Sequence, residues 1–403
     1  MPDMSTRTTQ PLSPTMGRRA AMTGSAMAAA FCAGQSWGRV TKPHDISAIM
    51  PLPLPLTQPV LANPVTPIRV TDPKPVPADT LAEWMVFKRR FISADGRVID
   101  THNGGVSHSE GQGWAMLFAA TCDDRATFDL LHGWTQQHLQ RGFDHLHAWR
   151  YRPNAAVPVD DQNNATDGDV WIAAALGRAA WRWGRPELAE RGRAIAHDIL
   201  HVLLREAGPR LVLLPGAEGF TRPGSLTVNP SYYAFPALEE LAALAPSPLW
   251  SRLIADGHAL LDDARFGPYK LSPDWLLIDR ATGAVSPHPN WPARFSYDAI
   301  RVPLWLAWSG EHYSVVAESF ARYWNIYQTN PPAWVDLNTN ASANYPAPSG
   351  MLAIGRIATV LSQRETKQPP VIGFPELRTS PDYYSAALIM LSRCAWHECR
   401  SMV

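Results

Sequence analysis

Residues 107–120 read SHSEGQGWAMLFAA, in which Ser109, Glu110 and two glycines precede an apolar run of helical character. The apolar part is typical of a helix that lies inside a protein core. Such a helix has no need of an acid, because burying an unpaired charge is costly. Glu110 is therefore a candidate functional residue.

Helical patterns of this kind recur from Asp79 almost to the end of the chain. The segment 124–142 begins with an aspartate and ends at Gly142, 169–184 ends at Gly184, and 186–208 begins with a proline and ends at Gly208. These are residues that typically start and stop helices. Further helical patterns lie near 80–92, 110–122, 232–245, 248–264, 299–309, 312–328, 350–362 and 381–397.

Strand-like alternation is scarce by comparison. The segment 269–279 is predicted to form one side of a small hairpin, with 283–289 as its return. No repeat of fixed period is present, which argues against a solenoid. We therefore predict an all-α protein, a toroid of helical hairpins in an α/α barrel with minor β-hairpin insertions.

The composition excludes several classes of protein. The 403 residues carry a formal net charge of zero, so nothing attracts the chain to nucleic acid or to an anionic membrane. No apolar run approaches the about 18 residues of a transmembrane helix, and none is expected in the mature chain. Most of the 16 Trp and 11 Tyr residues are expected to pack in the core. Several would instead offer a stacking face to a sugar ring.

The N-terminal region has the layout of an export signal. Arg18 and Arg19 precede a weakly apolar stretch and an A-x-A sequence at 28–30. We predict a signal peptide over 1–34, of the general secretory or the twin-arginine type, and hence a periplasmic or secreted protein. The alternative is a disordered basic tail. The proline-rich residues 35–78 are predicted to be an extended linker, and 79–403 to be the folded domain.

The cysteines and histidines do not form a recognisable metal site. In an oxidising compartment Cys394 and Cys399 would be available for a disulfide, although their helical spacing makes its geometry awkward. Cys122 is predicted to pack in an apolar helix. His102 and His108 lack metal-ligand spacing, and no HExxH or CxxC motif is present, so we expect no metal.

Three predicted helices begin with acids. Glu110 is the first, Asp167 and Asp169 precede a helix expected to start near Val170, and Asp298 precedes one expected to start near Ala299. Each alone has the ordinary interpretation of a helix cap, a role that Ser109 is also expected to play. Together, in a barrel whose inner helices start at one rim, they would converge on a cleft. Glycoside hydrolysis requires such convergent carboxylates, one protonated and one ionised.

Several segments resemble one family in sequence and in order. SEGQGWAM (109–116), ATDGDVWIAAAL (165–176), NPSYY (229–233) and SYDAIRVP (296–303) are similar to the landmarks of the family 8 glycoside hydrolases, in particular those that accompany bacterial cellulose synthase. FKRRFISADGRVID (87–100) and LSPDWLLID (271–279) also match. The likeness covers roughly 84–390. Trp114 and Ala115 depart from the usual Tyr and Gly.

The resemblance implies an (α/α)6 barrel that cleaves internal bonds of β-1,4-glucan with inversion and without a cofactor. It implies that Glu110 is the general acid and that Asp298 is the base. Asp167 either holds the distorted sugar or is itself the reacting carboxylate. A helix N-terminus lowers a carboxyl pKa, so burial or an ionised Asp167 is expected to keep Glu110 protonated.

Six further residues are candidates for substrate contact. Trp149, Tyr232 and Trp275 are predicted either to line the cleft or to pack in the core. Arg301, one turn after Asp298, would keep that acid ionised or form a surface pair. The remaining two, Asn229 and Tyr297, would face sugar hydroxyls.

Two other functions remain open at this point. One is a non-catalytic glucan-binding or scaffold protein of the cellulose synthase complex, although all three acids are retained. The other is a hydrolase of chitosan or of mixed-linkage glucan on the same fold. The expected partner in each case is a polysaccharide.

Overall fold

The computed structural model describes residues 75–310, 314–327, 330–361 and 372–399. The predicted signal peptide and all but the last four residues of the predicted linker lie outside these ranges. The described residues contain eleven α-helices and nine short strands. None of these helices is long and apolar enough to cross a membrane.

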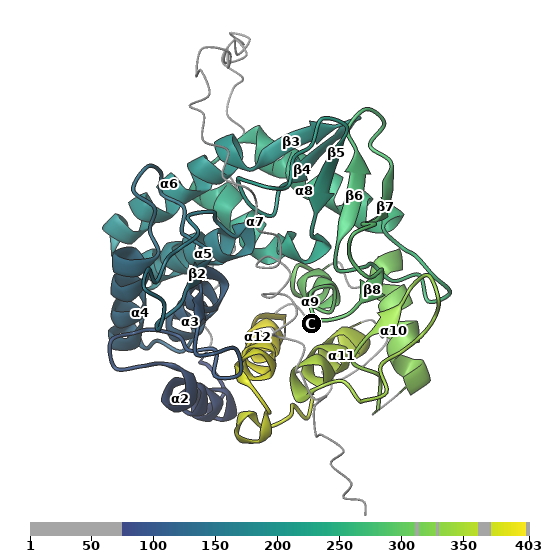
Figure 1. The fold of residues 1–403 in the computed structure, drawn as a ribbon. Helices are drawn as coiled ribbons and strands as arrows, with labels where there is room; N and C mark the ends of the chain where they lie inside the picture. Colours follow the sequence, from purple (N-terminus) through teal and green to yellow (C-terminus); the bar gives the residue numbers. More distant parts are fainter. Residues whose placement is uncertain (1–74, 311–313, 328–329, 362–371, 400–403) are drawn as a thin grey trace, which may run out of the picture.

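The helices form two concentric rings (Figure 1). Six inner helices pack in sequence, and the last returns to the first: α3 (Ser109–Thr121), α5 (Thr166–Trp183), α7 (Phe235–Leu244), α9 (Arg301–Trp308), α11 (Ser349–Leu361) and α12 (Tyr383–Cys399). Five described helices pack outside them: α2 (Ala78–Phe91), α4 (Arg125–His138), α6 (Pro186–Val202), α8 (Pro248–Asp263) and α10 (Val315–Tyr327). The fold is the predicted (α/α)6 barrel.

Burial distinguishes the two rings. Every residue of α3 except Glu110 is buried, so this helix lies wholly in the interior. The outer helix α4 buries one face with Phe128 and Leu131, while Leu130 is exposed. Its predicted cap is also present, because Asp124 accepts a hydrogen bond from the Thr127 N–H. These patterns follow from the helical periodicity of apolar residues.

Some predicted helix ends are wrong. The α5 helix starts at Thr166, four residues before the expected Val170, so Asp167 and Asp169 lie in its first turn. It ends as expected at Gly184, which has a left-handed backbone. The α4 helix ends at His138 rather than near Gly142. The α6 helix begins at Pro186 as expected but ends at Val202, because Gly208 turns a β-hairpin instead of ending the helix.

The strands form small antiparallel sheets. The predicted hairpin is present as β6 (Leu276–Asp279) and β7 (Val285–Pro287), and β5 (Ser225–Val228) adds a third strand, with Leu226 opposite Ile278. Three further pairs were not predicted: β1 (Ser107–His108) with β2 (Arg150–Tyr151), β3 (Leu204–Ala207) with β4 (Arg210–Leu213), and β8 (Arg294–Phe295) with β9 (Val335–Asp336).

The two ends of the barrel differ in the length of their connections. Chain segments that run from an inner to the next outer helix are short, as at 122–124, 184–185 and 245–247. Segments that run from an outer to the next inner helix are long, as at 92–108, 139–165, 203–234 and 264–300. All nine described strands lie in the long segments. The long segments therefore build the rim where the inner helices begin.

The cysteines on α12 do not form the disulfide considered from the sequence. Cys394 and Cys399 are both buried and free, and Cys122 at the end of α3 is half-buried and free. Residues five apart on a helix point about 140° away from each other, so the two thiols of α12 cannot meet.

Candidate active site

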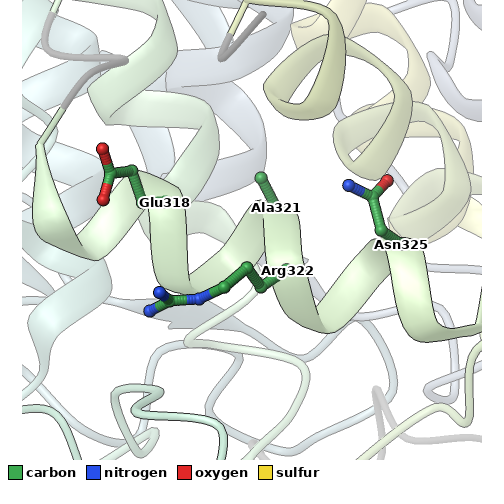
Figure 2. Close-up of a pocket in the computed structure, with 4 residues that line it drawn as sticks. All are labelled: Glu318, Ala321, Arg322 and Asn325. Atoms are coloured by element: carbon green, nitrogen blue, oxygen red, sulfur yellow. The ribbon is translucent and has the colours of Figure 1, made fainter.

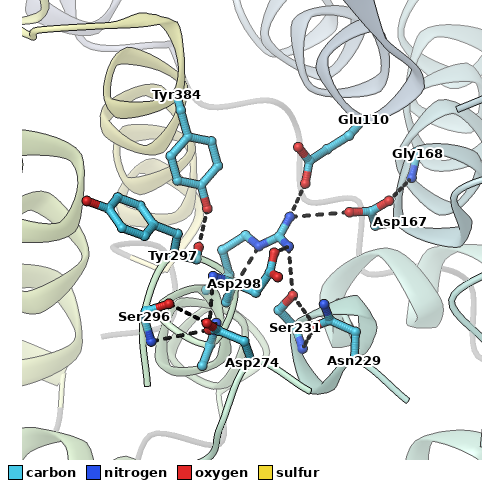
Figure 3. Close-up of polar contacts among 12 residues, drawn as sticks. Glu110, Asp167, Gly168, Asn229, Ser231, Asp274, Ser296, Tyr297, Asp298 and Tyr384 are labelled. Atoms are coloured by element: carbon cyan, nitrogen blue, oxygen red, sulfur yellow. Dashed lines mark hydrogen bonds and ion pairs between the residues drawn. The ribbon is translucent and has the colours of Figure 1, made fainter. Parts of the chain in front are cut away.

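Four charged side chains meet where the inner helices begin. Glu110 is the second residue of α3 and Asp167 the second residue of α5. Asp298 lies in the turn before α9, and Arg301 is the first residue of α9. Figure 3 shows the three acids pointing toward one another from these separate elements. The acids expected at three helix starts therefore form one cluster.

A glycine allows two of these helix starts to approach. A Cβ atom on Gly168 would come within 2.2 Å of Ser109 Oγ and 2.8 Å of the Glu110 nitrogen. Only a residue without a side chain fits between the first turns of α3 and α5. The glycine beside Asp167 therefore brings this acid close to Glu110.

Arg301 holds the acids together. Its Nη1 donates to the Glu110 carboxylate and, at 3.3 Å, to Asp167 Oδ2. Its Nη2 donates at 2.8 Å to Asp298 Oδ1 and at 2.7 Å to Ser231 Oγ. The planar guanidinium suits this role because it carries several donors in a fixed geometry.

The side chains of the cluster differ in exposure. Arg301 and Asp167 are 3% and 6% exposed, whereas Glu110 and Asp298 retain 18% and 16%. Water and a bound molecule can therefore reach Glu110 and Asp298, while the other two lie beneath them.

The electrostatics favour a proton on Glu110. Burial raises its pKa well above the ordinary value, the Arg301 charge opposes this rise, and the Asp167 charge adds to it. Burial also raises the pKa of Asp298, again against the effect of Arg301. One guanidinium cannot neutralise three buried carboxylates, so the cluster retains a proton. Burial and the Asp167 charge thus both raise the pKa of Glu110, as expected from the sequence.

A fourth acid, Asp274, lies behind Asp298 and was missed. It precedes β6 and accepts hydrogen bonds from the turn that carries Asp298 (Figure 3). Its burial and the Asp298 charge raise its pKa to about 7. Asp274 lies in the segment LSPDWLLID that resembled the family, but nothing in the pattern of that segment separates it from an ordinary loop aspartate.

The segment 229–232 supplies polar groups beside Arg301. Asn229 precedes the short helix η1 (Pro230–Tyr232), and its Oδ1 accepts from the N–H and hydroxyl of Ser231. Its buried Nδ2 donates no hydrogen bond of standard geometry, although the side chain lowers the pKa of Asp298. Tyr232 lies 5.8 Å from the Arg301 guanidinium, measured to the ring centre. Both predicted residues therefore lie at the cluster.

Trp149 lies in the long connection between α4 and α5. Its ring stacks on His108, with centroids 6.1 Å apart, and its Nε1 donates to Asp161 Oδ2 at 2.9 Å. Its carbonyl accepts from the Ser109 N–H, which places it next to the start of α3. Trp149 is half-buried rather than part of the core.

Trp275 and Tyr297 lie on the other side of the cluster. Trp275 stacks between Phe220 and Trp291 and is half-buried. The carbonyl of Tyr297 accepts a hydrogen bond from the Tyr384 hydroxyl at the start of α12 (Figure 3). Tyr384 was not predicted, because its neighbours in the sequence make it look like an ordinary helix residue.

Ser109 and Asp169, also at these helix starts, do not contact Arg301. Ser109 does not cap α3: it lies inside the helix, and its buried hydroxyl has no hydrogen-bond partner. Asp169 faces away from Arg301 and accepts from the N–H and Nδ1 of His147 and from Asn164 Nδ2. It therefore anchors the segment that carries Trp149.

A groove elsewhere on the surface is not comparable. It is lined by Glu318, Ala321, Arg322 and Asn325, which all lie on α10 (Figure 2). The charged cluster, in contrast, draws side chains from three elements and buries them. The cluster is the candidate active site.

Buried carboxylates that differ in proton affinity, flanked by aromatic rings at the rim of an α/α barrel, are suited to cleavage of glycosidic bonds. The fold and the site thus define the class of protein as a glycoside hydrolase. The chain belongs to the glycosyl hydrolases family 8, whose family model matches residues 75–397.

Individual relatives agree with this assignment. A probable endoglucanase of Novacetimonas hansenii is 45% identical over 318 residues, which cover 79% of this chain and 91% of the relative. An endoglucanase of Cellulomonas uda is 41% identical over 67% of this chain and 75% of its own. The structure of the endo-beta-1,4-glucanase CMCax from Acetobacter xylinum aligns with a TM-score of 0.75 and 43% identity, over 79% of this chain and 98% of the other.

Proposed function

We propose that this glycoside hydrolase is an endo-β-1,4-glucanase that cleaves internal bonds of cellulose-type glucan with inversion of the anomeric carbon. The endoglucanase names of relatives at 41–45% identity support the activity and the substrate. Glu110 is the general acid, Asp298 the base that activates water, and Asp167 a carboxylate that holds the sugar next to the cut.

These roles rest on the difference in proton affinity between Glu110 and Asp298. Both are open to solvent, which a group that reacts with substrate or water requires. Glu110 has the more strongly raised pKa, as expected for an acid that must keep its proton. Arg301 donates to both carboxylates, but Asp298 alone of the two also has its pKa lowered by the Asn229 side chain, which favours its ionised form. Asp167 is nearly inaccessible, which disfavours it as the base.

The neighbouring side chains would bind the glucan. Trp149 and Trp275 are half-buried on either side of the cluster, each packed against neighbouring rings, and their remaining exposed surface would contact sugar units. Asn229 is buried beneath the cluster, where its side chain lowers the pKa of Asp298 and so supports the ionised base.

The test compares substrates and variants. We expect wild-type protein to release reducing sugar from carboxymethylcellulose and to lower its viscosity early, as internal cleavage requires, with little action on chitosan or xylan. Glu110→Gln and Asp298→Asn should abolish cleavage, while Glu190→Gln, at an exposed residue of α6, should not. Preference for chitosan, or binding of glucan without cleavage, would favour one of the two other functions.

Stereochemistry tests the assignment of the base. Proton NMR during cleavage of a cello-oligosaccharide should show the α-anomer first. Asp298→Ala should regain activity with azide on a β-glycosyl fluoride, since azide can take the place of water on the α face and displace fluoride from the β face to give the α-glycosyl azide. If the β-anomer forms first, inversion and the base role of Asp298 are both wrong.

We further propose that residues 1–34 are a signal peptide, that residues 35–78 are a linker, and that the enzyme acts in the periplasm or outside the cell, on glucan made by a cellulose synthase complex. The paired arginines and the A-x-A sequence support export. Mass spectrometry of cell fractions should find protein that lacks about the first thirty residues. Cytosolic protein with an intact Met1 would contradict this proposal.

A further inference from the structure

Asp274 binds the backbone of the turn that carries Asp298. Its Oδ1 accepts from the N–H groups of Ser296 at 3.2 Å, Asp298 at 3.2 Å and Ala299 at 2.8 Å. Its Oδ2 accepts from the hydroxyl of Ser296. Every one of these contacts is a donor to the carboxylate and lowers its pKa, although burial and the Asp298 charge raise that pKa by more.

The backbone of Asp274 reinforces this contact. Its N–H donates at 2.8 Å to the carbonyl of Arg294, at the start of the segment that leads to the turn. The start of β6 is thereby joined to the 294–299 segment through both main chain and side chain. Asp274 is half-buried, and its two carboxylate oxygens are both engaged by the turn.

Asp298 depends on this support. Its carboxylate is bound by Arg301 Nη2, and Asn229 lies beside it, but both contacts only orient the end of the side chain. The position of its main chain is set by the turn. An error of about 1 Å in the position of a reacting group is enough to lower a rate about 100-fold.

The two aspartates also affect each other electrostatically. The charged groups that face Asp298 are Arg301 on α9, Asp167 on α5, Glu110 on α3 and Asp274 behind the turn, with the Tyr384 hydroxyl on α12 nearby. Like charges so close titrate as a pair. The charge of Asp298 contributes to the raised pKa of Asp274, so Asp274 takes up a proton more readily than an ordinary aspartate.

We propose that Asp274 is a positioning residue of the active site, which fixes the turn that carries Asp298 and so holds Asp298 in place to activate water. This inference rests on the proposed function, because it assumes that Asp298 activates water. Asp274 itself does not touch the substrate.

The decisive variant is Asp274→Asn, whose side-chain oxygen can still accept from the backbone while the charge is lost. We expect kcat on carboxymethylcellulose to fall about 10- to 100-fold with little change in KM, because the defect lies in positioning the base. The wild-type kcat should change as Asp274 titrates near pH 7, and this change should be absent from Asp274→Asn, whose amide does not titrate. A purely structural role would not add that component to the pH profile.

Asp279→Asn is the matched control. Asp279, at the end of β6, accepts from two backbone N–H groups and from the Thr282 hydroxyl in the same way, but it is exposed and does not contact Asp298. Its kcat and pH profile should equal those of the wild type. If Asp274→Asn does not fold, Ser296→Ala replaces it: losing one donor to Asp274 should lower kcat about 3-fold in folded protein.

The outcomes separate the two proposals. The proposed function is supported if the wild type cleaves carboxymethylcellulose and Asp298→Asn does not. It is refuted if the wild type is inactive or if Asp298→Asn is still active. With both results in hand, a folded Asp274→Asn with wild-type kcat overturns the present inference. So does a loss of kcat with the pH profile of the wild type retained. For a misfolded Asp274→Asn, an unchanged Ser296→Ala has the same meaning.

Discussion

Glu110 differs from its neighbours on α3 in one respect: the other residues of the helix are buried, and it is partly open. A glutamate side chain that is free in water is ionised at neutral pH. Burial and the charge of Asp167 hold the proton of Glu110 in place, and Arg301 limits the effect. The balance of these neighbours gives an ordinary glutamate the properties of an acid catalyst.

Removal of that proton should matter most when the leaving group is poor. Glu110→Gln is expected to lower kcat on cello-oligosaccharides by about 100- to 10,000-fold. Aryl glycosides with good leaving groups need less protonation and should lose much less. Initial rates on both substrates test this expectation. Equal losses would show that Glu110 is not the acid.

Stability should also depend on the proton of Glu110. Its pKa in the folded protein is raised above the ordinary value of 4.5, so the folded state binds this proton more tightly than the unfolded state. The resulting stability is fully present below the ordinary pKa and is lost as the pH rises through the raised one. The melting temperature should therefore fall over that range, and Glu110→Gln should reduce the fall. A slope equal to that of wild type would contradict the raised pKa.

At the scale of the elements, the start of α3 and the start of α5 touch with no side chain between them at Gly168. Gly113 also lets the two helices pack closely, because an added Cβ there would lie 3.0 Å from the Ile172 nitrogen. Small residues at these positions set the distance between the two helices. Through that distance they set the relative position of Glu110 and Asp167.

Gly168→Ala should therefore push α3 and α5 apart. We expect a loss of about 1–3 kcal/mol in the free energy of unfolding, together with a lower kcat. Gly133→Ala on α4 is the matched control, because nothing lies within 4 Å of its added Cβ. That variant should gain about 0.5–1 kcal/mol, since alanine favours a helix. Denaturant unfolding of both variants tests the pair, and equal effects would refute the steric argument.

The helices could be predicted from the sequence to a much greater extent than the strands. Helices such as α3 and α4 have long apolar patterns with clear start residues, whereas β1 and β8 are two residues long and have no period to detect. The three acids were found because each lies near a helix start. Asp274 and Tyr384 were missed because their importance comes from contacts distant in the chain. Ser109 was misread because α3 begins one residue earlier than a serine cap requires.

At the scale of the whole molecule, the end of the barrel opposite the site has its own charged cluster. Arg178 on α5 binds Glu240 on α7 and Glu398 near the end of α12, and Trp308 at the end of α9 donates to Glu398 at 2.7 Å. Four inner helices are thus connected, including the last helix of the chain. This cluster closes the ring without contacting the substrate.

Arg178→Met should lower stability but not catalysis. Unpairing two acids that are 20% and 32% exposed should cost about 2–3 kcal/mol, less than the about 3–5 kcal/mol of a fully buried pair. Arg125→Met, which breaks an exposed pair with Asp129 on α4, should cost less than about 1 kcal/mol. Denaturant unfolding and kcat provide the two measurements. A large loss of kcat in folded Arg178→Met would mean that the two ends are coupled.

The unequal connections of the barrel bear on how enzymes of this architecture change over evolutionary time. The proposed catalytic acids and their arginine belong to helix starts and one anchored turn, while much of the surrounding rim comes from the long segments. Lengthening a surface loop costs little free energy, since the entropy of closure grows only with the logarithm of length. Insertions and exchanges in 139–165 or 203–234 would therefore alter which polymer is accepted while the reaction itself is inherited unchanged. The architecture separates diversification of substrate from conservation of chemistry.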